Sequence, residues 1–335
     1  GVRIESCEIS GHGQHGVVLF GNRSGVDRSS ISSVGCGGVW VVGGVARTLT
    51  HGEMYATHNR IWDFALWMRS YHPGVRWGGV GNVYSHNWIH NSPHNCIYGG
   101  GNDPPPFSNA TLAIAIESGS GSECVFENNT LDTCAYECQD CGAFYTCGQQ
   151  GQAWVNRGNK LRSTVFRNIG ITSLDTPYRW APWWPTGQIG AYFDDQMSGW
   201  EVYNNSFSDC EGGIVLGGGR RTHIKFNSFE NCDWAIHTDD RGMNGLGAGN
   251  LQTMLTSFAR FNVTEPPWAT RYPYLANELE DNPAWPEYNQ ISYNRYRLVR
   301  SFMDGLSPEA FENYHSSAFE NSQVNGVVLR PCSGL

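Results

Sequence analysis

The feature that most constrains the fold of this 335-residue chain is an internal repeat of about 22 residues. Each copy reads as a short alternating strand, an asparagine and a second alternating strand, and the clearest copies begin at Val80, Gly121, Ser198 and Arg221. A second apolar block ending in glycines or acids follows, as in Gly213-Ile-Val-Leu-Gly-Gly-Gly. A unit this short cannot bury its apolar face alone, but stacked copies can.

The repeat predicts an all-β chain, a right-handed parallel β-helix forming a single domain over residues 1–335. Propeller blades need about 40–50 residues each, so the copies recur too quickly for a propeller; a β-sandwich is the other competing fold. Asparagine suits one repeated corner because it tolerates the left-handed conformation and its amide can bond the next coil. The chain has 27 asparagines and 41 glycines, which is consistent with many such turns.

Three stretches break the period and are predicted to be insertion loops: about 103–118, 172–188 and 243–288. The third contains apolar residues at helical spacing from Asn250 to Phe261, so we expect a helix there that ends before Pro266-Pro267. Because a strand-like segment begins at Val2, we expect N-terminal coils or a signal peptide to precede Gly1.

Charge and composition exclude several classes of protein. The chain has 31 acidic and 22 basic residues, a formal charge of −9, and only two lysines. This balance argues against a nucleic-acid partner. No apolar run approaches the roughly 18–20 residues that a membrane span needs.

Cysteines and glycosylation sequons indicate a secreted glycoprotein. The sequence has 11 cysteines, and its sequons begin at Asn22, Asn109, Asn128, Asn204 and Asn262. Local disulfides are favoured within the cluster from Cys124 to Cys147, with zinc at Cys138-Gln-Asp-Cys141 as the less favoured alternative. Cys210 and Cys232 occupy the same position in consecutive copies and are a candidate disulfide pair.

The turn after the second apolar block gathers acidic residues. Asp195 and Asp239 are two periods apart, and Gly217 lies halfway between them. Adjacent coils of a parallel sheet are about 4.8 Å apart, so the acidic coils would be separated by roughly 9–10 Å with a glycine floor between them. Glycoside hydrolysis needs two carboxyls at such a separation or closer. We predict Asp195 and Asp239 as the catalytic pair, with Asp194 and Asp240 as less favoured members.

Other residues near this corner are predicted to contact a polysaccharide or oligosaccharide. We expect side chains to contribute hydrogen bonds, charge or aromatic stacking, and glycines to leave open space. The predicted residues are His237, Arg220, Arg241, Asp103, Tyr145, Gly217, Gly218, Trp184 and Trp268. We predict no cofactor. Calcium bound by the four aspartates is the alternative, because hard cations prefer oxygen ligands.

Several blocks resemble the right-handed parallel β-helix carbohydrate-active proteins of the pectate-lyase-like superfamily, and are similar to the glycoside hydrolase branch with fucosidase and xylanase activity. The blocks, in an order spanning roughly 80–330, are Pro93–Asp103, Cys141–Thr146, Gly190–Gly199, Leu216–Arg220, Ala235–Gly242 and Pro266–Pro273. In that branch two aspartates on neighbouring coils are the proposed catalytic pair, which implies those roles for Asp195 and Asp239. The sequence departs from the branch at Thr146-Cys-Gly-Gln-Gln-Gly, where relatives more often have Gly-Arg-Asp-Trp.

The sequence therefore predicts a secreted glycoside hydrolase that cleaves a polysaccharide. Two alternatives stay open. One is a non-catalytic extracellular glycoprotein, either a carbohydrate-binding protein or a structural subunit that associates end to end into oligomers or filaments. The other is a polysaccharide lyase, in which Arg or His would serve as the base because lysine is so scarce.

Overall fold

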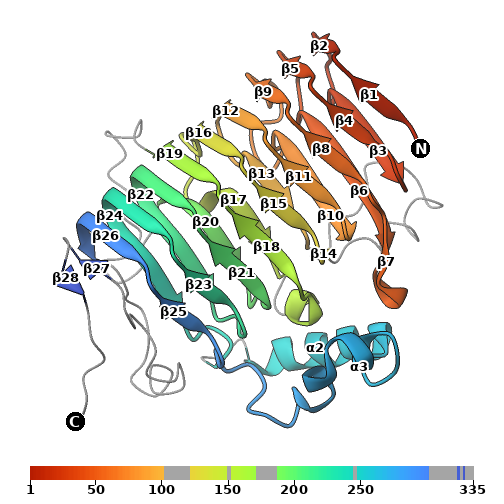
Figure 1. Cartoon of the computed structure of the whole chain (residues 1–335), viewed down its shortest axis with the longest axis vertical. Helices are drawn as coiled ribbons and strands as arrows, with labels where there is room; N and C mark the ends of the chain where they lie inside the picture. The colour runs from red at the N-terminus through yellow and green to blue at the C-terminus, as the bar shows by residue number, and fades with distance from the viewer. Residues whose placement is uncertain are drawn as a thin grey trace.

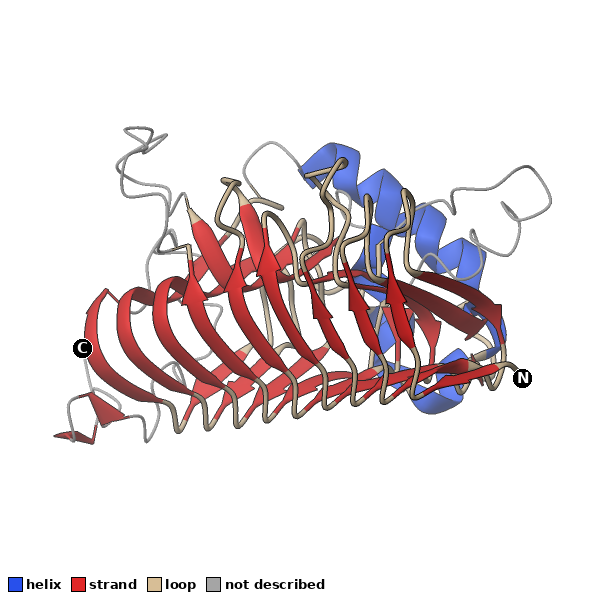
Figure 2. Ribbon diagram, turned by 90° about the horizontal axis from the view of Figure 1, so that it is seen from above, coloured by secondary structure: helices blue, strands red, loops and turns tan. Residues whose placement is uncertain are grey.

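The computed structural model describes residues 1–101, 121–148, 152–170, 187–243, 247–301, 323–324 and 327–328. About half of these residues form strands, most of them in large parallel sheets, and helices are few (Figures 1 and 2). The chain advances coil by coil, so that each strand pairs with the equivalent strand one coil later. The prediction of an all-β chain with parallel sheets is confirmed, and the arrangement is compatible with a parallel β-helix.

One face of the molecule is a nine-stranded sheet in which all neighbours are parallel. Its strands, in order, are β1 (Arg3–Glu5), β4 (Gly25–Asp27), β8 (Tyr55–Thr57), β11 (Val83–Ser85), β15 (Val125–Glu127), β18 (Asn159–Arg162), β21 (Trp200–Tyr203), β23 (His223–Lys225) and β25 (Gln290–Ser292). We call this sheet the first face.

The remaining strands form a second sheet with two rows. One row contains β2 (Glu8–Ser10), β5 (Ser30–Ser32), β9 (Arg60–Trp62), β12 (Trp88–Ser92), β16 (Thr130–Cys134), β19 (Val165–Ile169) and β26 (Arg295–Ser301). The other contains β3 (Val17–Gly21), β6 (Val39–Val45), β10 (Val75–Val80), β13 (Ile97–Gly99), β14 (Gly121–Ser122), β17 (Cys141–Cys147) and β20 (Gln188–Asp194). Two long strands, β22 (Ser206–Gly217) and β24 (Ser228–Asp239), pair with both rows.

Three short strands remain, and one of them, β27 (Gln323–Val324), extends the first row by pairing parallel with β26. β7 (Thr50–His51) pairs antiparallel with β6, and β27 pairs antiparallel with β28 (Val327–Val328).

A two-residue turn joins each strand of the first face to the next strand of the chain. The first turn residue has a positive φ, between 48° and 59°, in all nine turns: Ser6, Arg28, His58, His86, Asn128, Ser163, Asn204, Phe226 and Tyr293. The second residue is most often asparagine, as at Asn59, Asn87, Asn129, Asn205, Asn227 and Asn294. The expected asparagine corner is confirmed, although the left-handed residue and the bonding residue are neighbours rather than one position.

These second-position asparagines form buried ladders between coils. The Oδ1 atom of Asn227 accepts from both the backbone N and the Nδ2 of Asn205, each at 3.0 Å. Asn294 accepts from Asn227 in the same way at 2.9 and 3.1 Å. Each amide therefore satisfies buried backbone groups that the corner would otherwise leave unpaired.

The core fills the space between the faces with columns of similar side chains. Phe166, Phe207, Phe229 and Tyr296 stack on successive coils with ring centroids 4.5, 4.9 and 5.3 Å apart. All four are at most 2 % exposed. Because the sequence repeats, similar side chains pack on one another from coil to coil.

The insertion near 243–288 is partly helical, as predicted. It contains α2 (Gly247–Phe261), α3 (Trp268–Arg271) and the 3-10 helix η3 (Pro273–Asn277). These pack against η1 (Ala46–Thr48) and η2 (Gln152–Val155). Trp268 is 1 % exposed and its Nε1 donates to the Ala46 carbonyl at 3.0 Å, so its predicted contact with substrate is wrong: it anchors the insertion.

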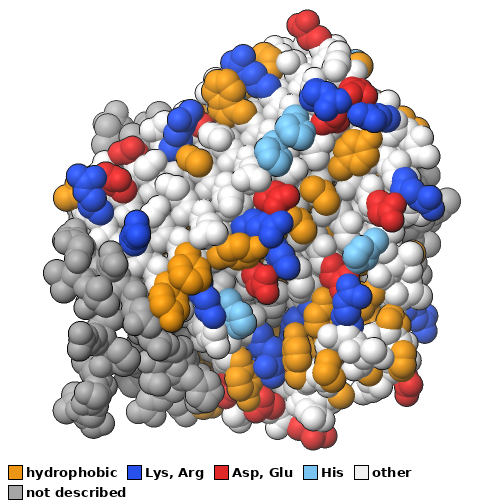
Figure 3. Space-filling model, in the orientation of Figure 1, with side chains coloured by type: hydrophobic (Ala, Val, Ile, Leu, Met, Phe, Trp, Pro, Cys, Tyr) orange, Lys and Arg blue, Asp and Glu red, His pale blue; other side chains and the backbone are white. Residues whose placement is uncertain are grey.

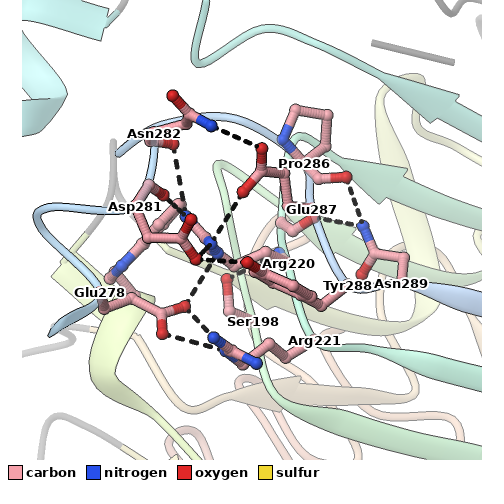
Figure 4. Close-up of polar contacts among 12 residues, drawn as sticks. Ser198, Arg220, Arg221, Glu278, Asp281, Asn282, Pro286, Glu287, Tyr288 and Asn289 are labelled. Carbon is pink, nitrogen blue, oxygen red and sulfur yellow. Dashed lines mark hydrogen bonds and ion pairs between the residues drawn. The ribbon is translucent and has the colours of Figure 1, made fainter. Parts of the chain in front are cut away.

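A buried ion cluster fastens the end of the insertion to the coils (Figure 4). Arg220 is fully buried, with its Nε 2.8 Å from Glu278 and its Nη2 3.1 Å from both Asp281 and Glu287. The prediction that Arg220 contacts substrate is therefore wrong, because its donors are used to hold the insertion.

Two disulfides are present, Cys96–Cys134 and Cys138–Cys141, so the local disulfide is confirmed at the Cys-x-x-Cys motif. The proposed Cys210–Cys232 pair is not formed, and both thiols are free. These cysteines are register partners on parallel strands, where side chains run side by side about 4.8 Å apart rather than toward each other. A disulfide needs Cβ atoms closer than that, at roughly 3.8 Å. In the part of the chain that the structure describes, no helix has the length and apolar character to cross a membrane.

Candidate active site

Strand register brings one aspartate, a glycine and a second aspartate to the ends of three consecutive coils. Gly217 pairs with Asp239, and Leu216 pairs with Phe193, so the residue level with both is Asp194. The predicted pairing of Asp195 with Asp239 is off by one residue, because the coil that starts at β20 is one residue longer than the coil that follows it. Asp195 lies in the turn, with φ of 44°.

Asp194 is held by groups on neighbouring strands. The hydroxyl of Tyr145 donates to Asp194 Oδ2 at 2.7 Å, so Tyr145 lies at this site, and its contact with substrate stays a prediction. Tyr145 and Tyr192 stack on adjacent strands, with centroids 5.1 Å apart, and are 4 % and 1 % exposed. Tyr192 was missed by the sequence reasoning, although its position level with Tyr145 in the next coil is a usable signal.

Arg241 is the central cation of the site. Its Nε and Nη2 donate to the two oxygens of Asp239 at 2.9 and 2.6 Å, and its Nη1 donates to Asp194 Oδ1. The same Nη1 lies 3.6 Å from Asp195 Oδ1. Arg241 lies at the predicted corner, where its observed partners are the aspartates, and its contact with substrate stays a prediction.

The glycine floor is not open. A Cβ built on Gly217 would lie 2.7 Å from Arg241 Cζ, and one on Gly218, whose φ is 72°, would lie 3.0 Å from Arg241 Cγ. Gly217 and Gly218 therefore make room for the guanidinium that bridges the acids. The expected empty space between the two acidic coils is corrected to a space filled by Arg241.

The two aligned carboxyls have opposite pKa shifts. Burial, with the charge of Asp195 adding to it, raises the pKa of Asp194 to about 6 despite the opposing charge of Arg241. Burial also acts to raise the pKa of Asp239, but His237 and the cation Arg241 outweigh it and lower that pKa to about 2. His237 Nε2 lies 3.7 Å from Asp239 Oδ2. Despite burial, the carboxylate of Asp239 above all raises the pKa of Arg241, which keeps it a cation.

Exposure differs among the four aspartates. Asp194, Asp239 and Asp240 are 5–7 % exposed, whereas the Asp195 side chain is 27 % exposed. Asp240 follows β24, and its carbonyl accepts from the amide of Met243 at 2.7 Å. Access from solvent to the described part of the site is therefore greatest beside Asp195.

One group of possible metal ligands lies here. Cys147, Asp194 and Asp195 offer a sulfur and carboxylate oxygens within 4.8 Å of one another. The Cys147 thiol donates to Asp195 Oδ2 at 3.4 Å. This set does not fit Ca²⁺, which prefers only oxygen ligands, and Arg241 already brings a positive charge to both aspartates.

The remaining predicted residues fall elsewhere. Asp103, Trp184 and Asn109 lie outside the described residues. Asn22, Asn128, Asn204 and Asn262 are exposed, as acceptors of a glycan must be.

Comparisons with known proteins give no relative on which to base an assignment. No protein-family model, curated protein or solved structure matches the chain.

Proposed function

We propose that this chain is a glycoside hydrolase in which Asp194 is the general acid and Asp239 is the general base or nucleophile. The observation that carries the proposal is the opposed pKa shift of two carboxyls at aligned strand ends. Titratable pairs whose environments separate their pKa values are typical of acid–base assignments in glycosidases. The sequence-based pair is revised accordingly, from Asp195 to Asp194.

The chemistry follows from those two states. Below pH 6 Asp194 retains a proton that it can give to the glycosidic oxygen as the bond to the leaving sugar breaks. Above pH 2 Asp239 is a carboxylate that can activate water or attack the anomeric carbon. Two coils place the backbones roughly 9–10 Å apart, and the carboxyls lie closer than this because both bond to the guanidinium of Arg241.

Arg241 fixes the ionisation of this pair. Its Nε and Nη2 both donate to Asp239 and keep that carboxyl ionised and oriented, whereas Nη1 donates to Asp194. In this proposal Asp194 leaves its contact with Arg241 when the glycosidic oxygen arrives, while Asp239 stays bound.

The proposal extends to the fold family and the location of the protein. We infer a right-handed parallel β-helix, secreted and glycosylated, acting on a polysaccharide. The stacked parallel strands, the two disulfides and the exposed sequon asparagines support it.

The test is release of reducing ends from a panel of plant, algal and microbial polysaccharides. We expect Asp194→Asn and Asp239→Asn each to lower kcat by about 10²–10⁴-fold. Asp209→Asn, an aspartate on β22 outside the Arg241 cluster, is the matched control and should leave turnover unchanged. Wild-type turnover in both site variants would overturn the assignment.

The lyase alternative is weakened by the same geometry. A lyase needs a neutral base, and Arg241 is held as a cation by surrounding carboxylates. Ultraviolet absorbance from an unsaturated product would restore that alternative.

A non-catalytic carbohydrate-binding or structural protein is the second candidate. The burial of Asp194 and Asp239 favours it, because Arg241 could simply tie the coils together. Saccharide binding without any release of reducing ends from the panel would favour this candidate.

A further inference from the structure

A second site lies on the first face, away from the aspartates. A cavity of about 500 Å³ opens between the start of strands β21, β23 and β25 and the helical insertion. Its walls include Tyr272, Tyr274, Tyr288, Arg221, His223 and Gln290. On the face shown in Figure 3, hydrophobic and basic side chains gather beside this insertion. The volume is within the range of small-molecule sites, about 300–1,000 Å³. We call it the tyrosine cavity.

Arg221 is held in a fixed position in this cavity. Its guanidinium carbon lies 4.3 Å from the ring centroid of Tyr274 and 4.1 Å from that of Tyr288. Its Nε donates to both oxygens of Glu278, at 3.0 and 2.9 Å (Figure 4). Among the described residues, every hydrogen bond that Arg221 makes through its side chain uses Nε, which leaves Nη1 and Nη2 as donors for a ligand.

Charged groups of both signs surround the cavity. Lys225 donates to Gln290 Oε1 at 2.5 Å, and its charge acts on His223, so this cation lies beside the wall of the cavity. Glu201 is the opposing charge on the rim, and it lies 3.6 Å from Lys160. Burial, and then the charge of Lys225, lower the pKa of His223, so its imidazole is a neutral hydrogen-bonding group near pH 7.

We propose that the tyrosine cavity binds an acidic sugar unit of a saccharide chain. The carboxylate of a uronate pairs with the Nη donors of Arg221, since a guanidinium matches a carboxylate with two parallel hydrogen bonds. The ring of Tyr272, whose hydroxyl donates to Glu123 Oε1 at 2.8 Å, offers an apolar face to one side of a pyranose. Gln290 and His223 bond the sugar hydroxyls. The proposal rests on the proposed function only for the choice of a saccharide.

The experiment is calorimetric titration of the full chain carrying Asp194→Asn and Asp239→Asn, which prevents cleavage during the measurement. The probes are oligogalacturonides, the neutral galactose oligomers of equal length, and inorganic sulfate. We expect the acidic oligomer to bind at least ten times more tightly than the neutral one. Arg221→Lys and Tyr274→Ala should each weaken binding at least tenfold with the melting temperature little changed.

The outcomes separate the two proposals. Equal affinity for acidic and neutral oligomers, unchanged affinity in both variants, or binding of sulfate with no gain from the sugar would each overturn the cavity assignment. If binding depends on Arg221 but the protein cleaves no polysaccharide, the cavity assignment would be supported and the proposed hydrolase function would be contradicted. Arg271→Ala, at an exposed arginine of the insertion that does not line the cavity, is the control and should leave the affinity unchanged.

Discussion

Two arginines in this molecule each contact three carboxylates, and they do different things. Arg220 is surrounded by Glu278, Asp281 and Glu287, and Arg241 by Asp194, Asp195 and Asp239. Both arginines are buried or nearly so, and each joins segments distant in the sequence. From residue types alone the two clusters are nearly indistinguishable.

The difference lies in charge balance. The Arg220 cluster includes two further guanidiniums, because Arg157 and Arg221 both contact Glu278, at 3.6 and 2.9 Å. Three cations thus meet three acids, and the cluster binds the insertion to the coils. Among the described contacts of the other cluster, Arg241 is the one cation for three acids. Burial, with the nearby charge of Asp195 adding to it, raises the pKa of Asp194, and this is the cluster for which we propose acid–base chemistry.

The largest predicted effect is on turnover. Asp194→Asn should lower kcat by about 10²–10⁴-fold, whereas Glu287→Gln should leave kcat per folded molecule unchanged. The measurement is reducing-end release with the folded fraction determined by near-ultraviolet circular dichroism. Equal loss of turnover in both variants would break the distinction between the clusters.

The next effect is on stability. Arg220→Ala leaves three buried or half-buried acids with fewer partners and should lower the free energy of unfolding by about 3–5 kcal/mol in urea titrations. The matched control is Arg167→Ala, at a half-exposed pair with Asp132, which should lower it by less than about 1 kcal/mol. Similar losses from the two changes would show that the burial of Arg220 does not increase its contribution to the free energy of unfolding.

A third effect depends on pH. The pKa of Asp194 is about 6 in the folded chain and near 3.8 when unperturbed, so between these values the folded chain binds the extra proton. Stability should therefore fall as pH rises from 3.8 to 6, by about 3 kcal/mol, and Asp194→Asn should remove the fall.

The contribution of Asp239 to stability depends on pH in the opposite direction. Its depressed pKa contributes stability that is present above 3.8 and lost as pH falls through about 2. Unfolding in urea across pH 2–7 measures the changes expected from both Asp194 and Asp239. Asp209→Asn is the control and should keep the wild-type dependence on pH. In parallel, hydrolysis should decline above pH 6 as Asp194 loses its proton.

The smallest effect is expected from Cys147→Ser. A serine hydroxyl can replace the thiol as donor to Asp195, so unfolding should change by about 1 kcal/mol or less. The pH at which hydrolysis declines should stay the same. A shift of that decline would mean that Cys147 takes part in setting the protonation of the aspartates.

The sequence predicts the repeat, the asparagine corner, the parallel sheets and the helical insertion because each depends on local pattern and periodicity. It aligns Asp195 with Asp239 because it assumes a strict 22-residue step, which holds from β22 to β24 but not from β20 to β22, where the step is 23 residues. One extra residue in a turn then moves the aligned position from Asp195 to Asp194.

Arg220 and Arg241 show what the pattern could not separate. Both follow glycines or acids at the same corner, and only the distant partner, Glu278 for one and Asp194 for the other, decides the role. Trp268 is a similar case: its aromatic ring reads as a sugar platform, but its contact with Ala46 spans 222 residues of sequence. Such partners depend on the path of the insertions, which a local pattern does not specify.

The two-residue corner that recurs in all nine coils has a further consequence. Because this corner has a constant length, the stacking of coils proceeds in equal steps of about 4.8 Å, whatever the length of the loops elsewhere. The separation of the two acidic strand ends is therefore quantised: it can be one step, two or three, but no intermediate value. Gradual adjustment of the distance between the carboxyls is left to side-chain rotation and to the arginine between them, and a larger change would need a whole coil gained or lost.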